Sequence, residues 1–381
     1  MSNDNSRVKQ NPLSIGILGA ARIAKKNCRA ASHPSTSCEI VAVASRSKEK
    51  GENFVSEVFG TIPSSAPIIY GGDAAYSNLI RDKSCDAVYV PLPTKLHKQY
   101  VISALDSGKH VLLEKPVANS ADEYRQMLVA ASKKAFVKSI PNPTRVHFNF
   151  TFDGDINFHQ NDIRTKKDGD FMGCIGDLGW YCARMGLLVF SGADAGNLKG
   201  LVTDVQTTRY ELNDDGVPMV AECIVHFTDN RVLSFHCSFV HPLNQTVQIS
   251  ASGSEYTAIE TDAILPFVGD KLTFTLVKQN LTQFDEIVTA DPKVVECDNT
   301  MVQEVCMWSH FNEWARMIEQ ESSSESSKAS VDMEKGIWWA GDSSGVKEAN
   351  AIASYSLLTQ TILDGLMESV RSGGSIVKVC S

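Results

Sequence analysis

The sequence predicts an α/β protein built from two parts. The first is a Rossmann domain, a doubly wound parallel sheet, and the second is a C-terminal α+β domain with a largely antiparallel open sheet. Over roughly 120 residues, apolar runs alternate with helical segments, as they do in βαβ units. Strand-like segments then follow one another, which is typical of an antiparallel meander. A chain of 381 residues is long enough for two domains, and we expect them at 12–139 and 140–381.

Each predicted strand of the first domain is a short apolar run, as expected for parallel strands that are buried on both faces. These runs lie at 14–18, 39–44, 86–90 and 110–113. Helices are expected after them, at 20–31, 48–59, 96–107 and from Ser120 onward. Gly108 stops one of these helices and Pro91 ends the third run. The alternation therefore predicts a parallel sheet with helices on its faces.

The second domain has a sequence period of two. Residues 145–152 (RVHFNFTF) alternate strictly, which predicts a strand with one buried face. Further strands are expected at 200–210, 220–228, 231–239, 246–251 and 257–264. Helices are expected at 177–189, 301–320 and 347–372. A sheet with one open face needs a cover, and a second subunit would supply it, so we expect a homodimer.

Composition narrows the class of protein. A net charge of −9 argues against nucleic acid as the main partner, because a phosphate surface selects for excess Lys and Arg. No stretch approaches the roughly 18 consecutive apolar residues of a membrane helix, and the first residues lack the apolar core of a signal peptide. We therefore expect a cytoplasmic protein without a membrane partner.

The ten cysteines are scattered singly along the chain. No pair has the short spacing of a zinc site or of a redox dithiol. Most of them lie within apolar patterns, so we expect buried free thiols in a reducing compartment and no metal site.

The loop after the first apolar run is the first functional candidate. Residues 19–24 (GAARIA) match the G-x-G-x-x-G/A pattern, in which small residues let backbone N–H groups approach a pyrophosphate at a helix N-terminus. Alanine replaces the second glycine, so a simple packing turn is the alternative. Because the loop follows the first strand of a βαβ unit, we expect it to bind a nucleotide. The candidate residues are Gly19, Ala21, Arg22 and Ile23.

The end of the second apolar run discriminates between cofactors. An NAD enzyme usually places Asp or Glu there to bind the ribose 2′-hydroxyl. This chain has Ser45 and Arg46, with no carboxylate before Glu49. A guanidinium beside a hydroxyl suits a 2′-phosphate, so we favour NADP over NAD. The alternative is a solvated basic start of the next helix.

The ends of the next two strands add candidates, because ligands bind at the carboxyl edge of an open α/β sheet. Leu92, Pro93 and His97 follow the third strand, although the prolines could merely stop it. Glu114 and Lys115 follow the fourth. We expect Lys115 to orient a substrate hydroxyl, and a surface lysine is the alternative. The bond from Lys115 to the following proline is a candidate cis peptide.

Asp177 and Tyr181 are four residues apart, which places both on one face of a helix. Tyr181 is a candidate acid/base that takes the proton of a substrate hydroxyl while hydride leaves the same carbon. A nearby ammonium such as that of Lys115 would favour its ionised form, and an ordinary core tyrosine is the alternative. Arg164 and Trp180 are candidate substrate contacts.

Taken together, these motifs resemble the Gfo/Idh/MocA oxidoreductase family, and within it the dimeric dihydrodiol dehydrogenases and the NADP-dependent D-xylose dehydrogenases. The similar segments are IGILGAARIA at 15–24, VASRS at 43–47, VYVPLPTKLH at 88–97, KHVLLEKPVA at 109–118, NDIR at 161–164 and GDLGWYCAR at 176–184. The resemblance covers nearly the whole chain and implies a Rossmann domain followed by an α/β domain whose open sheet supports dimers. It also implies that Lys115 is the catalytic lysine and Tyr181 the acid/base, with Asp177 beside the substrate.

One segment departs from the family. There, the helix after the EKP motif leads to a further parallel strand and another helix. Here, Lys134 is followed within a few residues by the proline-rich segment 139–144 (SIPNPT). We therefore expect the Rossmann domain to lack its last strand and helix, through a genuine deletion or through an artefact of the gene model.

The sequence thus favours an NADP-dependent oxidoreductase acting on a sugar or a cyclic diol. A non-catalytic NADP-binding regulator or scaffold is the alternative, as is an inactive shortened isoform. Which sugar or diol is used cannot be predicted, because pocket walls come from loops.

Overall fold

The computed structural model describes residues 11–60, 66–131, 143–191, 198, 200–251, 256–261, 271–283, 286–289, 293–298, 303–322 and 344–379. The chain divides into two compact units. The first unit comprises Met1–Leu92, Gln99–Glu114 and Met301–Ser323; the second comprises Pro93–Lys98, Lys115–Thr300 and Ser324–Ser381. Each unit contains one sheet, so each can be described by itself. Whether 12–139 and 140–381 act as the two functional domains stays a prediction.

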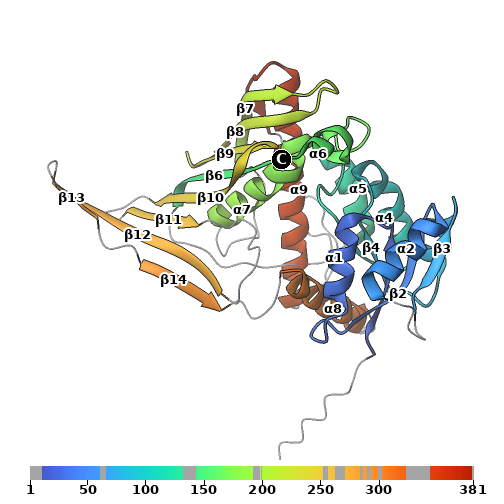
Figure 1. Ribbon diagram of the computed structural model, residues 1–381. Coiled ribbons are helices and arrows are strands. Elements are labelled where there is room, and N and C mark those ends of the chain that lie inside the picture. The colour runs from blue at the N-terminus through green and yellow to red at the C-terminus, as the bar shows by residue number, and fades with distance from the viewer. Residues whose placement is uncertain are drawn as a thin grey trace, which may run out of the picture. The chain divides into compact units, whose positions relative to one another are not determined.

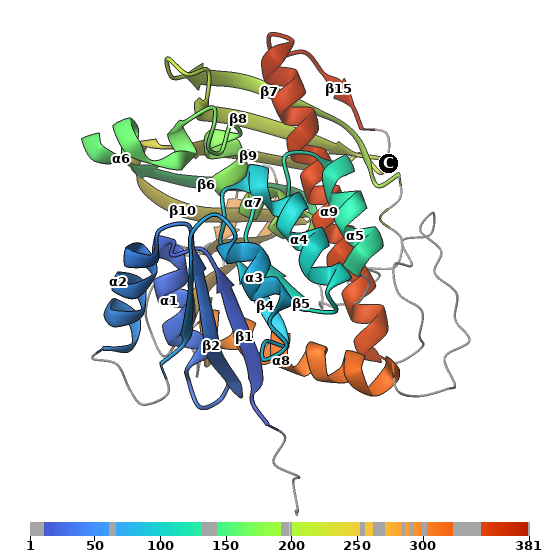
Figure 2. The ribbon, with the colours of Figure 1, turned by 90° about the vertical axis from the view of Figure 1, so that its right-hand side faces the viewer.

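The first unit is built on a five-stranded parallel sheet (Figure 2). Its strands are β1 (Leu13–Leu18), β2 (Cys38–Ser45), β3 (Ile68–Gly71), β4 (Ala87–Val90) and β5 (His110–Leu113). They pair in the order β3-β2-β1-β4-β5, which is the doubly wound arrangement expected of a dinucleotide-binding sheet. β1 and β4 are buried almost throughout, as their unbroken apolar runs require. The predicted Rossmann sheet is therefore confirmed.

Helices connect these strands. They are α1 (Arg22–Ala31), α2 (Lys48–Phe59), α3 (Ala75–Arg81) and α4 (His97–Asp106), the last preceded by the 3₁₀ turn η1 (Thr94–Leu96). Ser47 caps α2, because its side chain accepts a hydrogen bond from the backbone N–H of Lys50 at 3.2 Å. The pair β3 and α3 was not predicted. β3 has only four residues, and none of them is buried.

A late helix, α8 (Gln303–Ser322), completes the core of the first unit. Its Trp308 is fully buried and meets Tyr89 of β4 edge-to-face, with 5.7 Å between ring centroids. Phe311 and Ala315, on the same face of the helix, join this cluster. The sequence predicted the helix but not its position. The helix packs against the parallel sheet, where Trp308 contacts Cys38, a residue 270 positions earlier in the chain.

The second unit is built on a ten-stranded mixed sheet (Figure 1). Its path is β13-β12-β11-β10-β6-β9-β8-β7-β15, and β14 pairs with β12. The strands are β6 (Pro143–Asp153), β7 (Val202–Leu212), β8 (Pro218–Phe227), β9 (Val232–Ser238), β10 (Val240–Ala251), β11 (Tyr256–Thr261), β12 (Lys271–Gln283), β13 (Glu286–Thr289), β14 (Lys293–Asp298) and β15 (Val377–Lys378). Among the described strands of this sheet, only β6 and β9 pair in parallel, so the predicted, largely antiparallel sheet is confirmed. The strands β12 to β15 were not predicted.

The remaining helices belong mainly to the second unit. They are α5 (Ala121–Ala131), α6 (Ile156–Asn161), the 3₁₀ turn η2 (Ile163–Thr165), the π-helical turn η3 (Ile175–Gly179), α7 (Trp180–Ser191) and α9 (Ser344–Arg371). α7 and α9 pack on one face of the sheet, and α5 packs against α9 (Figure 2). Val146, Phe148 and Phe150 of β6 are buried on this face, as the strict alternation of that strand predicts.

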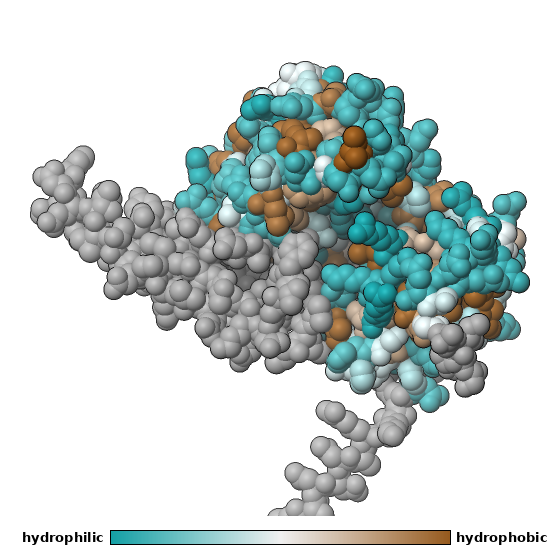
Figure 3. Space-filling model, in the orientation of Figure 1, coloured by the Kyte–Doolittle hydropathy of each residue, from teal (hydrophilic) through white to brown (hydrophobic). Residues whose placement is uncertain are grey.

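Among the described residues, no helix combines the length and the apolar character needed to cross a bilayer. Figure 3 shows a mainly hydrophilic surface in which hydrophobic patches are scattered. The cysteines whose side chains are described are free, and all of them except Cys38 are buried. The expected loss of the last Rossmann strand and helix concerns residues 132–142, which lie outside the described residues.

Candidate active site

The predicted nucleotide loop lies between β1 and α1 in the first unit. Gly19 adopts a φ of 113°, a conformation that favours glycine. A Cβ atom there would lie 2.9 Å from Cδ2 of the buried Leu92. Ala21 precedes α1 without any side-chain cap, and the first turn of the helix has no acidic residue. The N–H groups of that turn therefore form the kind of N-terminus that binds phosphate. Arg22 and Ile23, at the start of the helix, are exposed.

The end of β2 presents Ser45 and Arg46. Ser45 is buried, whereas Arg46 is exposed. The backbone carbonyl of Arg46 accepts a hydrogen bond from Gly72 N at 3.2 Å, which fixes the backbone at the edge of the sheet. Burial raises the pKa of the nearby Tyr76 hydroxyl, and the positive charge of Arg46 partly offsets that effect. Arg46 is thus held by its backbone while its charge remains accessible to an anion.

A buried polar chain reaches the end of β5 within the first unit. Tyr89 donates a hydrogen bond to Oε1 of Glu114, and Asn27 of α1 donates to the Tyr89 hydroxyl oxygen at 2.7 Å. Burial and the charge of Glu114 raise the pKa of Tyr89 far above its ordinary value, so the phenol remains a donor. Glu114 therefore has a fixed position, and Asn27 is a contributor that the sequence analysis missed.

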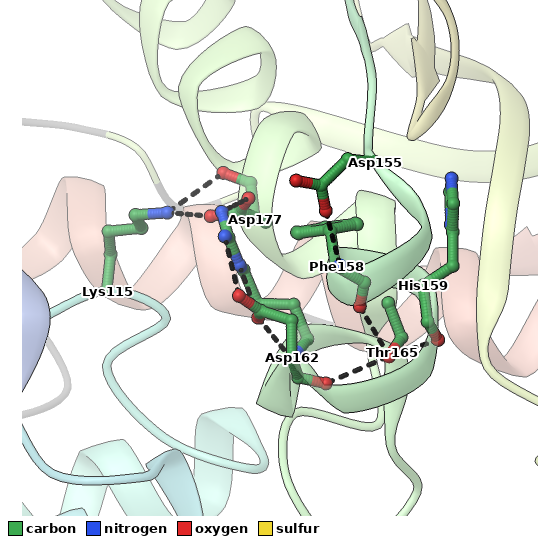
Figure 4. A network of polar contacts seen from close by, with 8 residues as sticks. Lys115, Asp155, Phe158, His159, Asp162, Thr165 and Asp177 are labelled. Carbon is green, nitrogen blue, oxygen red and sulfur yellow. Dashed lines mark hydrogen bonds and ion pairs between the residues drawn. The ribbon is translucent and has the colours of Figure 1, made fainter.

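In the second unit, the candidate catalytic residues Lys115 and Asp177 belong to one charged cluster, which we define as Lys115, Asp162, Arg164 and Asp177. Lys115 Nζ forms an ion pair with Asp177 Oδ1 and lies 3.3 Å from the Asp177 carbonyl oxygen. Figure 4 shows the two side chains pointing toward each other. Arg164 Nη1 donates to Asp177 Oδ2 at 3.0 Å. Asp177 therefore bridges two cations with its two oxygens.

The guanidinium of Arg164 is held on its other side by Asp162. Its Nε and Nη2 donate to the two carboxylate oxygens at 2.9 Å and 3.0 Å, the bidentate geometry that suits this pair. The guanidinium carbon also lies 4.7 Å from the ring centroid of Phe158, within cation–π range. Arg164 was expected to contact substrate; its hydrogen bonds instead join two carboxylates, and a substrate contact stays a prediction.

Local capping explains this arrangement. Asp155 caps α6 by accepting from Phe158 N at 2.7 Å. Asp162 caps the η2 turn by accepting from Arg164 N at 3.0 Å, and the Thr165 hydroxyl donates to the Asp162 carbonyl at 2.8 Å (Figure 4). Short polar side chains at helix starts are favoured for this reason. The caps fix both sides of the Arg164 backbone, so its side chain has little freedom.

Asp177 lies in the π-helical turn η3 rather than in a continuous α-helix. Burial alone would raise the pKa of Asp177, but the charges of Lys115 and Arg164 outweigh burial and hold that pKa below its ordinary value. Burial would likewise lower the pKa of Arg164, and Asp162 and Asp177 raise it instead. Asp177 and Arg164 are therefore both ionised at neutral pH.

Tyr181 lies beside this cluster at the start of α7. Lys115 Nζ is 5.1 Å from its ring centroid, and Phe150 meets the ring edge-to-face at a centroid distance of 5.7 Å. The ring is only partly buried. Residues 115 and 181 thus come together as expected, although their catalytic roles stay predictions. Trp180, by contrast, is buried.

Two further candidates have places in the second unit. His97 is buried, and its Nδ1 lies 3.2 Å from the carbonyl oxygen of Val117. This contact ties the start of α4 to the segment after Lys115. Pro93 precedes the η1 turn. The bond between Lys115 and Pro116 is cis, as suspected. Contacts of His97 and Pro93 with a cofactor stay predictions.

Replacing Asp177 by Asn should lower the free energy of unfolding at pH 7 by about 2–3 kcal/mol, because Lys115 and Arg164 lose a buried partner but keep some solvent access. Folding lowers the pKa of Asp177. The stabilisation that its ionised carboxylate provides is therefore fully present above the pKa of the unfolded state, and it is lost as the pH falls through the pKa of the folded state. Denaturant titrations from pH 7 to pH 3 should therefore show the wild type and the variant converging.

The matched control is Asp204→Asn. Asp204 on β7 also pairs with two basic groups, His226 and Lys378, but both of them are exposed, so the change should be less than about 1 kcal/mol. Equal losses for the two variants, or a pH-independent difference for Asp177→Asn, would contradict this account.

Comparison with known proteins gives three findings. Residues 13–140 match the family model GFO_IDH_MocA, described as "Oxidoreductase family, NAD-binding Rossmann fold". The chain is 40% identical over 111 residues to D-xylose 1-dehydrogenase (NADP(+)) 2 of Haloferax volcanii, an alignment that covers 29% of this chain and 31% of that protein. It is 27% identical over 259 residues to trans-1,2-dihydrobenzene-1,2-diol dehydrogenase of Xenopus laevis, covering 62% of this chain and 73% of the relative.

The matches extend further in structure than in sequence. The chain spans only 31–35% of the length of four curated relatives, among them sugar 3-reductases of Actinomadura kijaniata and Saccharopolyspora spinosa. A crystal structure of a 3-ketoreductase from Actinomadura kijaniata with NADP and TDP-benzene superposes with a TM-score of 0.65 at 18% identity, covering 94% of this chain and 98% of the other. Aldose-aldose oxidoreductase from Caulobacter crescentus gives a TM-score of 0.66 at 16% identity, covering 96% and 99%.

At such identities the structural likeness establishes the fold alone. The match to the family model is independent of it and spans the parallel sheet with its nucleotide loop. The resemblance predicted from the motifs is therefore confirmed: residues 13–140 match the NAD-binding Rossmann model of the Gfo/Idh/MocA oxidoreductase family.

Proposed function

We propose that the protein is an NADP-dependent oxidoreductase that transfers hydride between the nicotinamide and a hydroxyl-bearing carbon of a sugar or a cyclic diol. The observation that carries the proposal is the position of the Lys115 ammonium, which is paired with Asp177 and lies 5.1 Å from the ring centroid of Tyr181. Lys115 directly follows Glu114, the first residue after β5. The relatives named D-xylose and dihydrodiol dehydrogenases support the same class.

The first unit has the features that NADP requires. The uncapped start of α1 and the conformation of Gly19 suit a pyrophosphate, because backbone N–H groups can approach it closely. Ser45 and Arg46 suit the 2′-phosphate. The related 3-ketoreductase was crystallised with NADP. When bound, the cofactor supplies or accepts the hydride.

In the second unit, the protein's own contribution is proton transfer and orientation. The Tyr181 hydroxyl would take the proton of the substrate hydroxyl, and the Lys115 ammonium would favour the phenolate by its charge. Asp177 holds Lys115, and Arg164 in turn holds Asp177. The ammonium is therefore fixed before substrate arrives, which lowers the ordering required at the reactive step.

The charge of this site favours an uncharged substrate. The cluster contains two cations, Lys115 and Arg164, and two carboxylates, Asp162 and Asp177, all joined to one another. No net positive charge remains for a phosphate or carboxylate group on the substrate. Neutral polyols, whose hydroxyls both donate and accept hydrogen bonds, suit such a surface better.

The runner-up function is a non-catalytic NADP-binding regulator or scaffold. It would keep the nucleotide loop without using the charged cluster for chemistry. The shortened segment expected after Lys134 favours this alternative, since it would remove an edge of the sheet. Cofactor binding without turnover on a broad panel of polyols would identify it.

Replacing Tyr181 by Phe should reduce turnover by about 10²- to 10⁴-fold, because the proton acceptor is lost. NADP reduction with D-xylose or a trans-dihydrodiol measures the rate, and quenching of protein fluorescence measures cofactor binding, which should persist. Tyr210→Phe, at a half-buried tyrosine on β7, is the control and should leave turnover intact. Full activity of Tyr181→Phe would refute the assigned role.

Replacing Arg46 by Ala should raise the KM for NADP roughly tenfold to a hundredfold, the range for losing a charge-assisted hydrogen bond. The KM for NAD should hardly change, because NAD lacks the 2′-phosphate. Arg29→Ala is the control: Arg29 is exposed on α1 and donates to the Glu57 carbonyl at 3.3 Å. Equal effects on the two cofactors would contradict the assignment of Arg46.

We also propose a homodimer formed through the open face of the large sheet. In the described part of the chain, α7 and α9 cover one face only. The other face carries half-buried side chains in register across five strands. One such row is Gln206, Ile224, Ser234 and His147, which are half-buried, followed by the exposed Gln248. A second copy would cover this row and its neighbours.

Sedimentation should therefore show a dimer that Ile224→Lys converts to monomer, because a charge would be buried at the interface. Ile68→Lys, at an exposed isoleucine on β3, should leave the dimer intact. A wild-type monomer at micromolar concentration would exclude the proposed assembly.

A further inference from the structure

A fifth ionisable group adjoins the charged cluster. Asp170 is 6% exposed, and its Oδ1 has no hydrogen-bond partner in the described part of the chain. It lies in the polar loop between η2 and η3. A buried carboxyl oxygen without a partner is unfavourable when ionised, because neither water nor a donor compensates its charge. The mechanism proposed above does not use it.

The backbone holds Asp170 in place. Its N–H donates to the Ile163 carbonyl oxygen at 2.9 Å. The preceding residue is Gly169, where a Cβ would lie only 2.3 Å from the same carbonyl oxygen, so no larger residue fits. On the other side, a Cβ at Gly176 would lie 3.5 Å from Asp170 Oδ1. The carboxyl therefore lies against the turn that carries Asp177, and Gly169 allows the loop before it to approach Ile163.

The surroundings favour the neutral carboxyl. Burial is the main cause and the negative charge of Asp177 the next, and together they raise the pKa of Asp170 to about 7. Lys115, the Met172 N–H and Arg164 oppose this shift without cancelling it. These groups come from every segment that acts on Asp170 electrostatically: the residues after β5, the η2 turn, the loop itself and the η3 turn. Asp170 is thus poised to exchange its proton near neutral pH.

We propose that Asp170 is a positioning residue whose protonation sets the charge balance around Lys115 and Asp177. With its proton, the two cations and two carboxylates of the cluster are balanced. When the proton leaves to solvent, one negative charge is added beside Lys115. That negative charge offsets the positive charge of the ammonium near Tyr181, and it therefore disfavours the phenolate form of Tyr181. Oxidation of a hydroxyl, which needs the phenolate as proton acceptor, should therefore slow as Asp170 ionises.

This inference rests on the proposed function for its effect on turnover, but the ionisation itself can be measured without any substrate. Carboxyl ¹³C resonances of aspartate in the full-length protein, followed by NMR from pH 4 to pH 9, should include one that titrates near 7. That resonance should be missing from Asp170→Asn. The Asp177 resonance, assigned through Asp177→Asn, should shift with the same midpoint in the wild type and lose that step in Asp170→Asn.

The second readout is the pH dependence of kcat/KM for hydroxyl oxidation. Asp170→Asn keeps the size of the side chain and cannot ionise, so it should lose the descending limb near pH 7. The ratio of the variant's kcat/KM to that of the wild type should be several-fold larger at pH 9 than at pH 6. The matched control is Asp364→Asn. Asp364 is another largely buried carboxyl with a raised pKa, but it accepts its hydrogen bonds from Ala121 and Gln360, outside the cluster.

Three results would overturn the proposal. The first is an Asp170 resonance that titrates in the ordinary range for aspartate. The second is an Asp177 resonance that ignores the Asp170 step. The third is a pH profile that Asp170→Asn leaves unchanged, or that Asp364→Asn changes equally. Failure of the proposed function would appear differently, as absence of turnover in the wild type with the two NMR steps intact.

Discussion

The bridge that Asp177 makes between Lys115 and Arg164 is the interaction on which the rest of the candidate site depends. Its two carboxylate oxygens each receive one cation, and 62 residues separate it from the lysine. Without this bridge, an ammonium at the end of β5 would have no fixed direction. With it, the ammonium is held beside an aromatic ring whose hydroxyl can carry a proton.

Burying several charges together is unfavourable unless each one is paired and hydrogen-bonded. The second unit meets that condition by joining the charges in series. Lys115 pairs with Asp177, Asp177 with Arg164, and Arg164 with Asp162. The η2 turn and its cap contribute Arg164 and Asp162, and the η3 turn contributes Asp177. The aspartate caps of α6 and η2 fix the backbone around Arg164. The backbone that carries Arg164 is therefore held in place. Loss of one of these caps would weaken the ion pairs that orient Lys115.

Much of this could be predicted from sequence because it follows from local patterns. The strands of the parallel sheet are buried on both faces, so they appear as unbroken apolar runs. β3 was not predicted, although its first three residues are apolar. Amphipathic spacing predicted α8, but such spacing shows only that a helix buries one face. It could not show that Trp308 would pack on Tyr89.

Some residues of the candidate site could likewise be predicted from sequence, and others could not. Lys115 stood out because it follows an apolar strand, and Asp177 because it lies four residues before Tyr181 on a predicted helix. Asp162 and Asp170 did not, because isolated aspartates in a lysine-rich loop have the pattern of a solvated turn. The burial of Asp170 against the η3 turn depends on how the loop folds back, which the pattern of residue types does not show. Arg164 was singled out as a substrate contact, whereas its hydrogen bonds go to two carboxylates.

The central claim is that chemistry occurs where the Lys115 ammonium and the Tyr181 phenol meet. A crystal structure with NADP and an unreactive polyol bound would test it most directly. The account predicts one polyol hydroxyl within hydrogen-bond distance, about 2.6–3.2 Å, of both the Tyr181 oxygen and Lys115 Nζ, with the nicotinamide against the same carbon. A polyol bound elsewhere, or a nicotinamide directed away from Lys115, would contradict it.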